Sequence, residues 1–242
     1  MLGERLVVVS DAHIKADSGP ATESFLAFLE RVPTLGDCLL INGDLFEFWF
    51  SYRRAIPQTG FLVAAALAML RRKIPVAMTG GNHDRWGHGF WQREANILYH
   101  PDQLRFAVGT REVLALHGDG EIDGRGSGWL QRIIAHPVTE RAFGLLHPDF
   151  GLWLIARMGG HLADKTTDPA ILDAAQARQA AWARQRLAAD PTLGLVILSH
   201  THRSETIELD PGKHYLNPGA WIAGRRYAVV TATTISSEQF GG

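Results

Sequence analysis

The chain of 242 residues has a single cysteine and almost no net charge, with 24 lysines and arginines against 25 acidic residues. One cysteine excludes an internal disulfide framework and any zinc site built from several thiolates. The balanced charge argues against a strongly basic surface, so we expect no nucleic-acid partner. Hydrophobic residues make up 46% of the chain, which excludes a wholly disordered protein.

Long apolar runs are also missing. The longest, Phe61 to Leu70, has ten residues, whereas a membrane-spanning helix needs about 20. The N-terminal run from Leu6 to Val9 is too short for the core of a signal peptide. We therefore expect no transmembrane segment and a cytoplasmic protein. The lone Cys38 is interpreted as a buried strand residue.

Histidine is what the sequence has in excess. Eleven histidines without thiolate partners indicate that a bound metal would be held through nitrogen and oxygen ligands.

Buried strands and amphipathic helices alternate in the first third of the chain, which predicts a parallel sheet covered by helices. The strands are expected at Leu6–Ser10, Cys38–Asn42 and Val76–Thr79, and the helices at Thr22–Val32 and Phe61–Lys73. Leu104–Val108 and Glu112–Leu116 are expected to form an antiparallel hairpin.

Strand signals stop after this hairpin and return at Leu195. We therefore predict one α/β domain over residues 1–242, with a helical insertion at about 121–190. The last residues, Ser236–Gly242, are expected to fray.

Five expected strands run directly into polar clusters, and ligands of open α/β sheets bind outside the carboxyl ends of their strands. The clusters are Asp11-Ala12-His13, Gly43-Asp44, Gly81-Asn82-His83-Asp84, His117-Gly118-Asp119 and His200-Thr201-His202. Any one of them could be an ordinary turn or helix start. Five in order at strand ends are better explained by one convergent site.

The donor types in these clusters favour manganese, iron or zinc over soft metals. Asp44 has two carboxylate oxygens and could bridge two ions. The candidate ligands are Asp11, His13, Asp44, Asn82, His117, His200 and His202. Seven donors are too many for one tetrahedral ion but suit two ions that share Asp44.

The same series of motifs resembles the calcineurin-like metallophosphoesterases, over residues 7 to about 220. The resemblance implies a four-layer α/β/β/α sandwich and a centre of two divalent metal ions, often Mn²⁺, with Fe²⁺ or Zn²⁺ as alternatives. By position, one ion would be held by Asp11, His13, Asp44 and His202, and the other by Asp44, Asn82, His117 and His200. His83 would contact the phosphate as a stabiliser or leaving-group acid, oriented by Asp84.

A narrower resemblance, to the UDP-2,3-diacylglucosamine diphosphatases of the lipid A pathway, rests on Gly43–Trp49, His117–Asp119, His200–Arg203 and Ala156–Met158. It implies hydrolysis of a pyrophosphate to UMP and 2,3-diacylglucosamine 1-phosphate, under a helical cap that binds the acyl chains. His83 stands where the lipid enzymes carry Arg, and residues 159–165 replace a stretch rich in serine and asparagine. Another phosphoester or nucleotide pyrophosphate is therefore an open alternative, as is a scaffold that keeps the fold and binds partners.

We expect the insertion to determine which substrate the protein binds. Large apolar residues are frequent in it, and they predict either a packed cap or a groove for acyl chains. Four arginines against two acids between Arg125 and Arg157 favour peripheral contact with an anionic membrane surface, here the inner membrane. Arg157 and Lys165 are candidate phosphate-binding residues.

Overall fold

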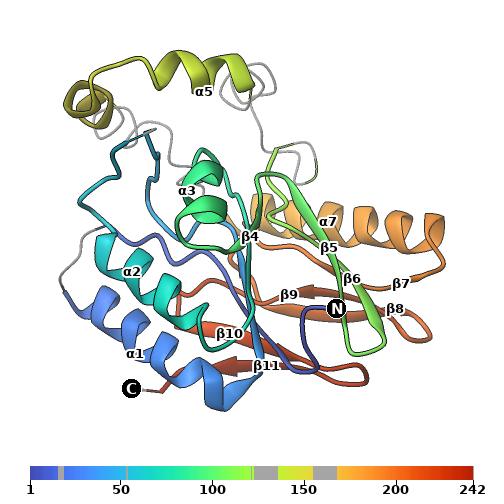
Figure 1. Cartoon of the computed structure of the whole chain (residues 1–242). Coiled ribbons are helices and arrows are strands. Elements are labelled where there is room, and N and C mark those ends of the chain that lie inside the picture. The colour runs from blue at the N-terminus through green and yellow to red at the C-terminus, as the bar shows by residue number, and fades with distance from the viewer. Residues whose placement is uncertain (16–18, 53, 121, 123–135, 155–167, 242) are drawn as a thin grey trace.

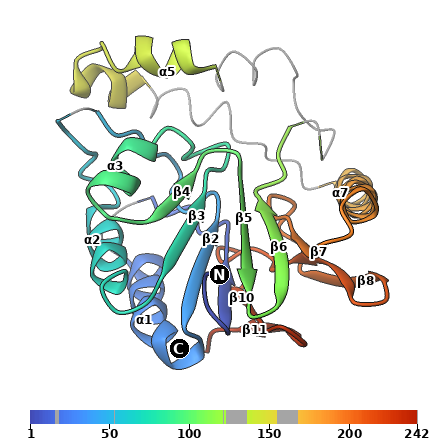
Figure 2. The same cartoon turned by 45° about the vertical axis from the view of Figure 1, so that its right-hand side comes forward.

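The computed structural model describes residues 1–15, 19–52, 54–120, 122, 136–154 and 168–241. Two mixed β-sheets stack face to face, and helices cover the outer face of each (Figures 1 and 2). The predicted four-layer α/β/β/α sandwich is confirmed. Within the described residues, no helix combines the length and the apolar character needed to cross a bilayer.

The first sheet has six strands, and its first four strands in sequence are parallel. Its spatial order is β11 (Ile235–Gln239), β10 (Arg226–Val230), β1 (Leu6–Val9), β2 (Cys38–Asn42), β3 (Val76–Thr79) and β4 (Leu98–His100). Strand β10 runs antiparallel to β1 and β11. Because β1, β2 and β3 are parallel neighbours, their carboxyl ends meet at one edge.

The second sheet has five strands. Its order is β5 (Gln103–Val108), β6 (Arg111–Leu116), β7 (Leu193–Ile197), β9 (Lys213–Asn217) and β8 (Glu205–Asp210). The predicted hairpin is confirmed as β5 and β6, which pair antiparallel. Strand β6 is parallel to β7 and β7 to β9, so β6 and β7 also end on the same side.

Side chains of the central strands alternate between two cores. Val7 and Leu39 face the core under the helices, whereas Leu6 and Leu40 face the core between the sheets. Both faces of β1 and β2 are buried, and their sequences are therefore continuous apolar runs. Cys38 is wholly buried in the core between the sheets, as predicted.

Helices α1 (Pro20–Leu35) and α2 (Phe61–Leu70) cover the six-stranded sheet. The 21-residue helix α7 (Pro169–Ala189) packs on β7 and β9 of the other sheet. It starts at Asp168, whose carboxylate accepts a hydrogen bond from Ala170 N at 2.9 Å, with Pro169 in the first turn. Although α7 falls inside the segment predicted as an insertion, it forms the fourth layer of the sandwich.

The short helix α5 (Pro137–Phe143) and a further helical turn at 148–154 form a cap above the sheets (Figure 1). The extent of the insertion stays a prediction, since residues 123–135 and 155–167 lie outside the described ones.

The expected fraying of the C-terminus is wrong. Residues Ile235–Gln239 form β11, which pairs with all of β10. The ring of Phe240 then packs 5.6 Å from Phe28 and 5.7 Å from Trp221. Backbone pairing and this aromatic contact hold a strand whose own side chains are mostly exposed. Helix α3 (His88–Arg93) and strand β4 were also not expected.

Candidate metal centre

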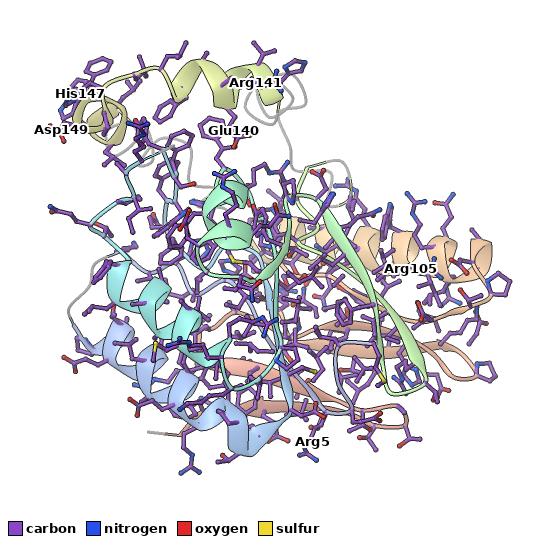
Figure 3. All side chains as sticks on the ribbon, in the orientation of Figure 1. Arg5, Arg105, Glu140, Arg141, His147 and Asp149 are labelled. Carbon is purple, nitrogen blue, oxygen red and sulfur yellow. The ribbon has the colours of Figure 1, made fainter. Side chains whose placement is uncertain are left out.

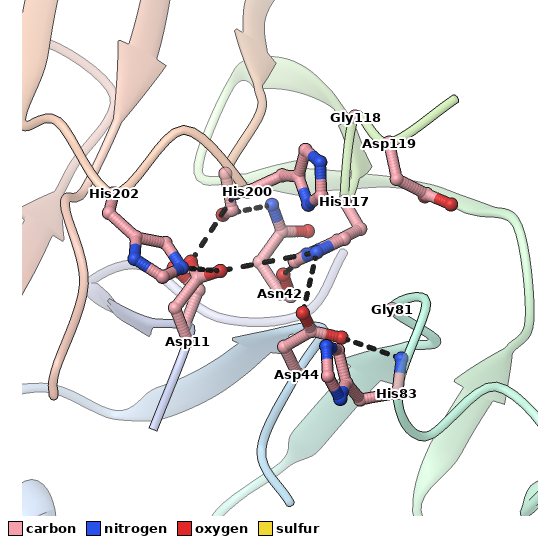
Figure 4. A network of polar contacts seen from close by, with 12 residues as sticks. Asp11, Asn42, Asp44, Gly81, His83, His117, Gly118, Asp119, His200 and His202 are labelled. Carbon is pink, nitrogen blue, oxygen red and sulfur yellow. Dashed lines mark hydrogen bonds and ion pairs between the residues drawn. The ribbon is translucent and has the colours of Figure 1, made fainter. Parts of the chain in front are cut away.

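All five polar clusters meet at the carboxyl ends of β1, β2, β3, β6 and β7 (Figure 4). Backbone hydrogen bonds join the clusters to one another. Asp11 N donates to Gly43 O at 3.2 Å, His13 N to Asp44 O at 3.0 Å and Ser199 N to His117 O at 2.8 Å. The last of these bonds ties the two neighbouring strand ends of the second sheet together. The site is therefore part of the sheet framework and not a set of free loops.

Most of the candidate ligands lie on left-handed backbone. Seven non-glycine residues in the described part of the chain have positive φ, and five of them are candidate ligands. These are Asp11 (51°), His13 (46°), Asp44 (52°), His200 (68°) and His202 (62°). Each such residue costs about 1 kcal/mol or more and persists only where its surroundings hold it. Strain concentrated on these side chains is typical of a functional site.

The ligand atoms gather into overlapping groups. Asp11, His13 and His202 bring their atoms within 4.8 Å of one another, and so do Asp44, His117 and His200. Each group holds three of the four residues that the resemblance implies for one ion, and the ligand sets themselves stay a prediction. A third group joins His13, Asp44 and His83, so Asp44 of the second group also lies close to His13 of the first.

Four candidate ligand atoms are buried and have no hydrogen-bond partner among the described residues. They are Asp11 Oδ1, His13 Nε2, Asn82 Oδ1 and His117 Nε2. Two of them have an ion-pair contact instead: Asp11 Oδ1 lies 3.2 Å from His202 Nε2, and His117 Nε2 lies 3.2 Å from Asp44 Oδ2. Buried polar atoms in proteins are almost always paired, because an unpaired one loses its hydration without compensation. Divalent cations would satisfy these atoms, so the donor set fits two metal ions.

Two residues that the sequence did not single out orient the histidine rings. The carbonyl of Asn42 lies 2.9 Å from His117 Nδ1. Since a carbonyl can only accept, Nδ1 carries the hydrogen and Nε2 faces Asp44. Glu47 Oε2 lies 3.4 Å from His13 Nδ1 in the same way. Carboxylates and carbonyls behind metal-binding histidines set the tautomer and ring direction.

Opposite charges shift the pKa values in the cluster. Burial opposes ionisation of Asp44, but His117, His83 and His13 outweigh it and hold the pKa of Asp44 well below its usual range. Burial likewise lowers the pKa of His117, and the charges of Asp44 and Asp11 overcome it, so that pKa lies well above the usual value. In the metal-free protein a proton on His117 therefore compensates the carboxylates.

His83 and Asp84 have different surroundings. The ring of His83 is held through Nδ1 by the carbonyl of Glu47 at 2.7 Å. The carboxylate of Asp84 accepts hydrogen bonds from the backbone N–H groups of Gly81, Asp44 and Leu45 at 2.9, 3.2 and 2.7 Å. These contacts hold the loop that carries Asp44. The expected orientation of His83 by Asp84 stays a prediction.

Two glycines allow the strand ends to approach. A Cβ added at Gly43, whose φ is +81°, would lie 2.5 Å from His117 Nδ1, and one at Gly81 would overlap Asp44 Oδ1. No larger residue fits at either position without moving a candidate ligand.

An aromatic cluster joins the cap to the loops that carry Asp44 and His83. Phe143 of α5 packs 4.7 Å from Phe50 and 5.5 Å from Trp86, which follow the clusters of Asp44 and His83. The cap therefore contacts the loops that carry these residues. Arg157 and Lys165, the candidate phosphate-binding residues, lie outside the described residues.

Comparison with known proteins adds family evidence. The model of the family described as "Calcineurin-like phosphoesterase" matches residues 4–204. A UDP-2,3-diacylglucosamine hydrolase of Porphyromonas gingivalis is 24% identical, with 97% of each chain covered. One of Serratia proteamaculans is 27% identical, over 96% of this chain and 97% of the relative.

Solved structures support the same fold. An archaeal phosphodiesterase aligns over 98% of this chain and 99% of its own with a TM-score of 0.51 at 11% identity. A Thermus thermophilus protein aligns over 98% of both chains with a TM-score of 0.50 at 12% identity.

Proposed function

Because the chain belongs to the calcineurin-like phosphoesterase family and is a metal-dependent hydrolase, we propose that it cleaves the pyrophosphate of UDP-2,3-diacylglucosamine. Water would add across the P–O–P bridge to give UMP and 2,3-diacylglucosamine 1-phosphate. The observation that carries the proposal is the pair of neighbouring ligand groups, Asp11, His13 and His202 in one and Asp44, His117 and His200 in the other, with a third group that joins Asp44 to His13. The full-length relatives of the chain are named for this substrate.

Two divalent cations, Mn²⁺ in our proposal, would occupy these groups. Asp11, His13, Asp44 and His202 would hold one, and Asp44, Asn82, His117 and His200 the other. When bound, such a pair activates a water molecule and neutralises charge on phosphate oxygens. The buried atoms of Asp11, His13, Asn82 and His117 that make no hydrogen bond among the described residues support this occupancy.

His83 is proposed as the group that contacts the phosphate. Its Nδ1 hydrogen is engaged by the carbonyl of Glu47, so the proton available for transfer is the one on Nε2 of the protonated ring. A proton from Nε2 would neutralise the oxygen of the departing phosphate. The ring lies beside the ligands, with its centroid 4.9 Å from that of His13.

The cap is proposed to bind the acyl chains and to touch the surface of the inner membrane. Four of its large apolar side chains are at least half exposed, namely Val138 (59%), Leu145 (88%), Phe150 (50%) and Trp153 (56%). Exposed apolar side chains on one small element favour contact with lipid. The same cap also carries four residues with charged or titratable side chains, Glu140, Arg141, His147 and Asp149 (Figure 3). Arg157 and Lys165 would bind phosphate oxygens.

A second candidate is hydrolysis of another phosphoester or nucleotide pyrophosphate. The feature that favours it is His83, since the resemblance to the lipid enzymes implies Arg at this position. Metal chemistry would be the same in both cases, and only the groups that bind the substrate would differ.

Three substrates separate the candidates. Purified protein with Mn²⁺ would be incubated with UDP-2,3-diacylglucosamine, with UDP-N-acetylglucosamine and with bis(p-nitrophenyl) phosphate. We expect UMP release from the lipid with a kcat/KM at least about 100-fold above that for the sugar without acyl chains, the equivalent of about 2.7 kcal/mol. Turnover of the generic diester but not of the lipid would favour the second candidate. No turnover by protein that holds two metal ions would indicate a scaffold.

A further inference from the structure

Helix α7 carries a fully buried glutamine on its inner face. Along this face Ala175, Ala183 and Leu187 are buried, and Gln179 lies among them with no exposed surface. A buried primary amide is costly unless its two N–H groups and its carbonyl oxygen are all paired. The hydrogen bonds of Gln179 therefore indicate what this buried amide does in the structure.

Gln179 uses its whole hydrogen-bonding capacity. Nε2 donates to Ser199 O at 2.9 Å and to Gly118 O at 3.3 Å. Oε1 accepts from the Tyr215 hydroxyl at 3.0 Å and from Asn217 Nδ2 at 3.4 Å. Two donors and two acceptor positions are satisfied, as expected of a network that holds one arrangement.

The two carbonyls that receive these bonds flank candidate metal ligands. Gly118 directly follows His117, and Ser199 directly precedes His200. One amide therefore bridges the loops after β6 and β7. Gly118 has a φ of +98°, and a Cβ there would lie 2.7 Å from Gln179 Nε2, so the loop approaches the glutamine closely.

Asn217 extends the same network along the second loop. Its Nδ2 donates to Ser199 O at 3.2 Å and to Thr201 Oγ1 at 2.9 Å. Thr201 lies between His200 and His202, which both have left-handed φ values. Backbone of this kind needs external contacts to persist, and Gln179 and Asn217 supply them.

We infer that Gln179 is a positioning residue for the metal centre: it fixes the loop of His117 relative to the loop of His200 and His202. Those loops supply ligands to both groups, His117 and His200 to one and His202 to the other. The inference rests on the proposed dinuclear centre. It assigns to the helix after the cap a direct part in building that centre, through backbone carbonyls and without contact to metal or substrate.

The test is the affinity of metal-free protein for Mn²⁺, measured by isothermal titration and by electron paramagnetic resonance of free Mn²⁺. Gln179→Met keeps the length of the side chain and removes all four hydrogen bonds. We expect the Kd for Mn²⁺ to rise about 10- to 100-fold, the range for residues that orient metal ligands. Amide exchange at residues 118 and 199–202 should become faster in the same variant.

Two controls separate positioning from loss of stability. Gln185→Met changes an exposed glutamine on the same helix and should leave the Kd unchanged. Ala183→Gly destabilises the buried face of α7 without touching the network, and its lower melting temperature should not be accompanied by weaker Mn²⁺ binding. A Kd of Gln179→Met within twofold of that of Ala183→Gly would overturn the inference.

If Gln179→Met does not fold, Tyr215→Phe decides. It removes one hydrogen bond to Oε1 and leaves the glutamine in place. A Kd raised about threefold or more supports the inference, and an unchanged Kd overturns it. These results do not depend on the substrate: wild-type protein that binds two Mn²⁺ ions but spares the lipid would contradict the proposed function alone.

Discussion

Nε2 of His117 lies 3.2 Å from Oδ2 of Asp44, and both side chains are almost completely buried. Without metal, this contact is an ion pair made by a protonated imidazole. In the proposed centre the same two atoms would be ligands of one ion, and the proton would have to leave. The pair therefore links pH, stability and metal binding.

The stability of the metal-free protein should fall as the pH rises above about 6.5. Because the folded pKa of His117 lies above its usual value of 6.5, its contribution is fully present below pH 6.5 and is lost as the pH rises through the folded pKa. Melting temperatures from pH 6 to 9 would measure this. The decline should be smaller in His117→Gln and unchanged in His147→Gln, an exposed cap residue. An equal decline in all three proteins would contradict the assignment.

Asp44→Ala should abolish the centre. Because Asp44 belongs to one ligand group and also lies close to His13 of the other, we propose that both ions need its carboxylate. Bound Mn²⁺ should therefore fall from two ions to none. Turnover should fall by far more than the roughly 10- to 100-fold seen when a residue that only orients a ligand is changed. Metal analysis after gel filtration gives the count. Asp149→Ala, on the cap, is the matched control. Retention of one tightly bound ion in Asp44→Ala would show that Asp44 does not bridge.

His83→Ala should separate catalysis from metal binding. If the ring donates a proton, kcat should drop about 10²- to 10⁴-fold while two Mn²⁺ ions stay bound. An empty metal centre in this variant would assign His83 to the ligands instead.

Glu47→Gln tests the carboxylate behind His13. The substitution removes the negative charge near Nδ1 of His13 but keeps the backbone carbonyl that holds His83. We expect the Kd of one of the two Mn²⁺ ions to rise about tenfold, with kcat at saturating metal changed less than threefold. Loss of kcat without a change in Kd would mean that Glu47 acts on the chemistry and not on the ligand.

The strand ends and their polar clusters could be predicted from the sequence because each signal is local. A buried strand such as Leu6–Val9 is a continuous apolar run, and Asp11 and His13 follow it within four residues. Parallel pairing then brings separate strand ends to one edge. The contacts of Gln179, Asn42 and Glu47 could not be predicted in this way. Gln179 bonds to carbonyls 61 and 20 residues away, and glutamine on a helix normally faces solvent.

Strand β11 was missed for a related reason. Four of its five side chains are exposed, so it lacks the alternation of apolar and polar residues that marks a half-buried strand. Its position is set by backbone pairing with β10 and by the aromatic contacts of Phe240. Neither can be read from residues 235–240 alone.

The left-handed backbone of the five candidate ligands lowers the stability of the fold at the same positions that the proposed activity requires. At about 1 kcal/mol or more each, these residues together cost an amount comparable to the whole stability of a small domain, about 5–15 kcal/mol. Glycine would adopt the same φ values without strain, but it has no ligand atom. A library screened only for heat resistance should therefore enrich glycine at His200 and His202, two of the candidate ligands that are not buried, and so select against the hydrolase.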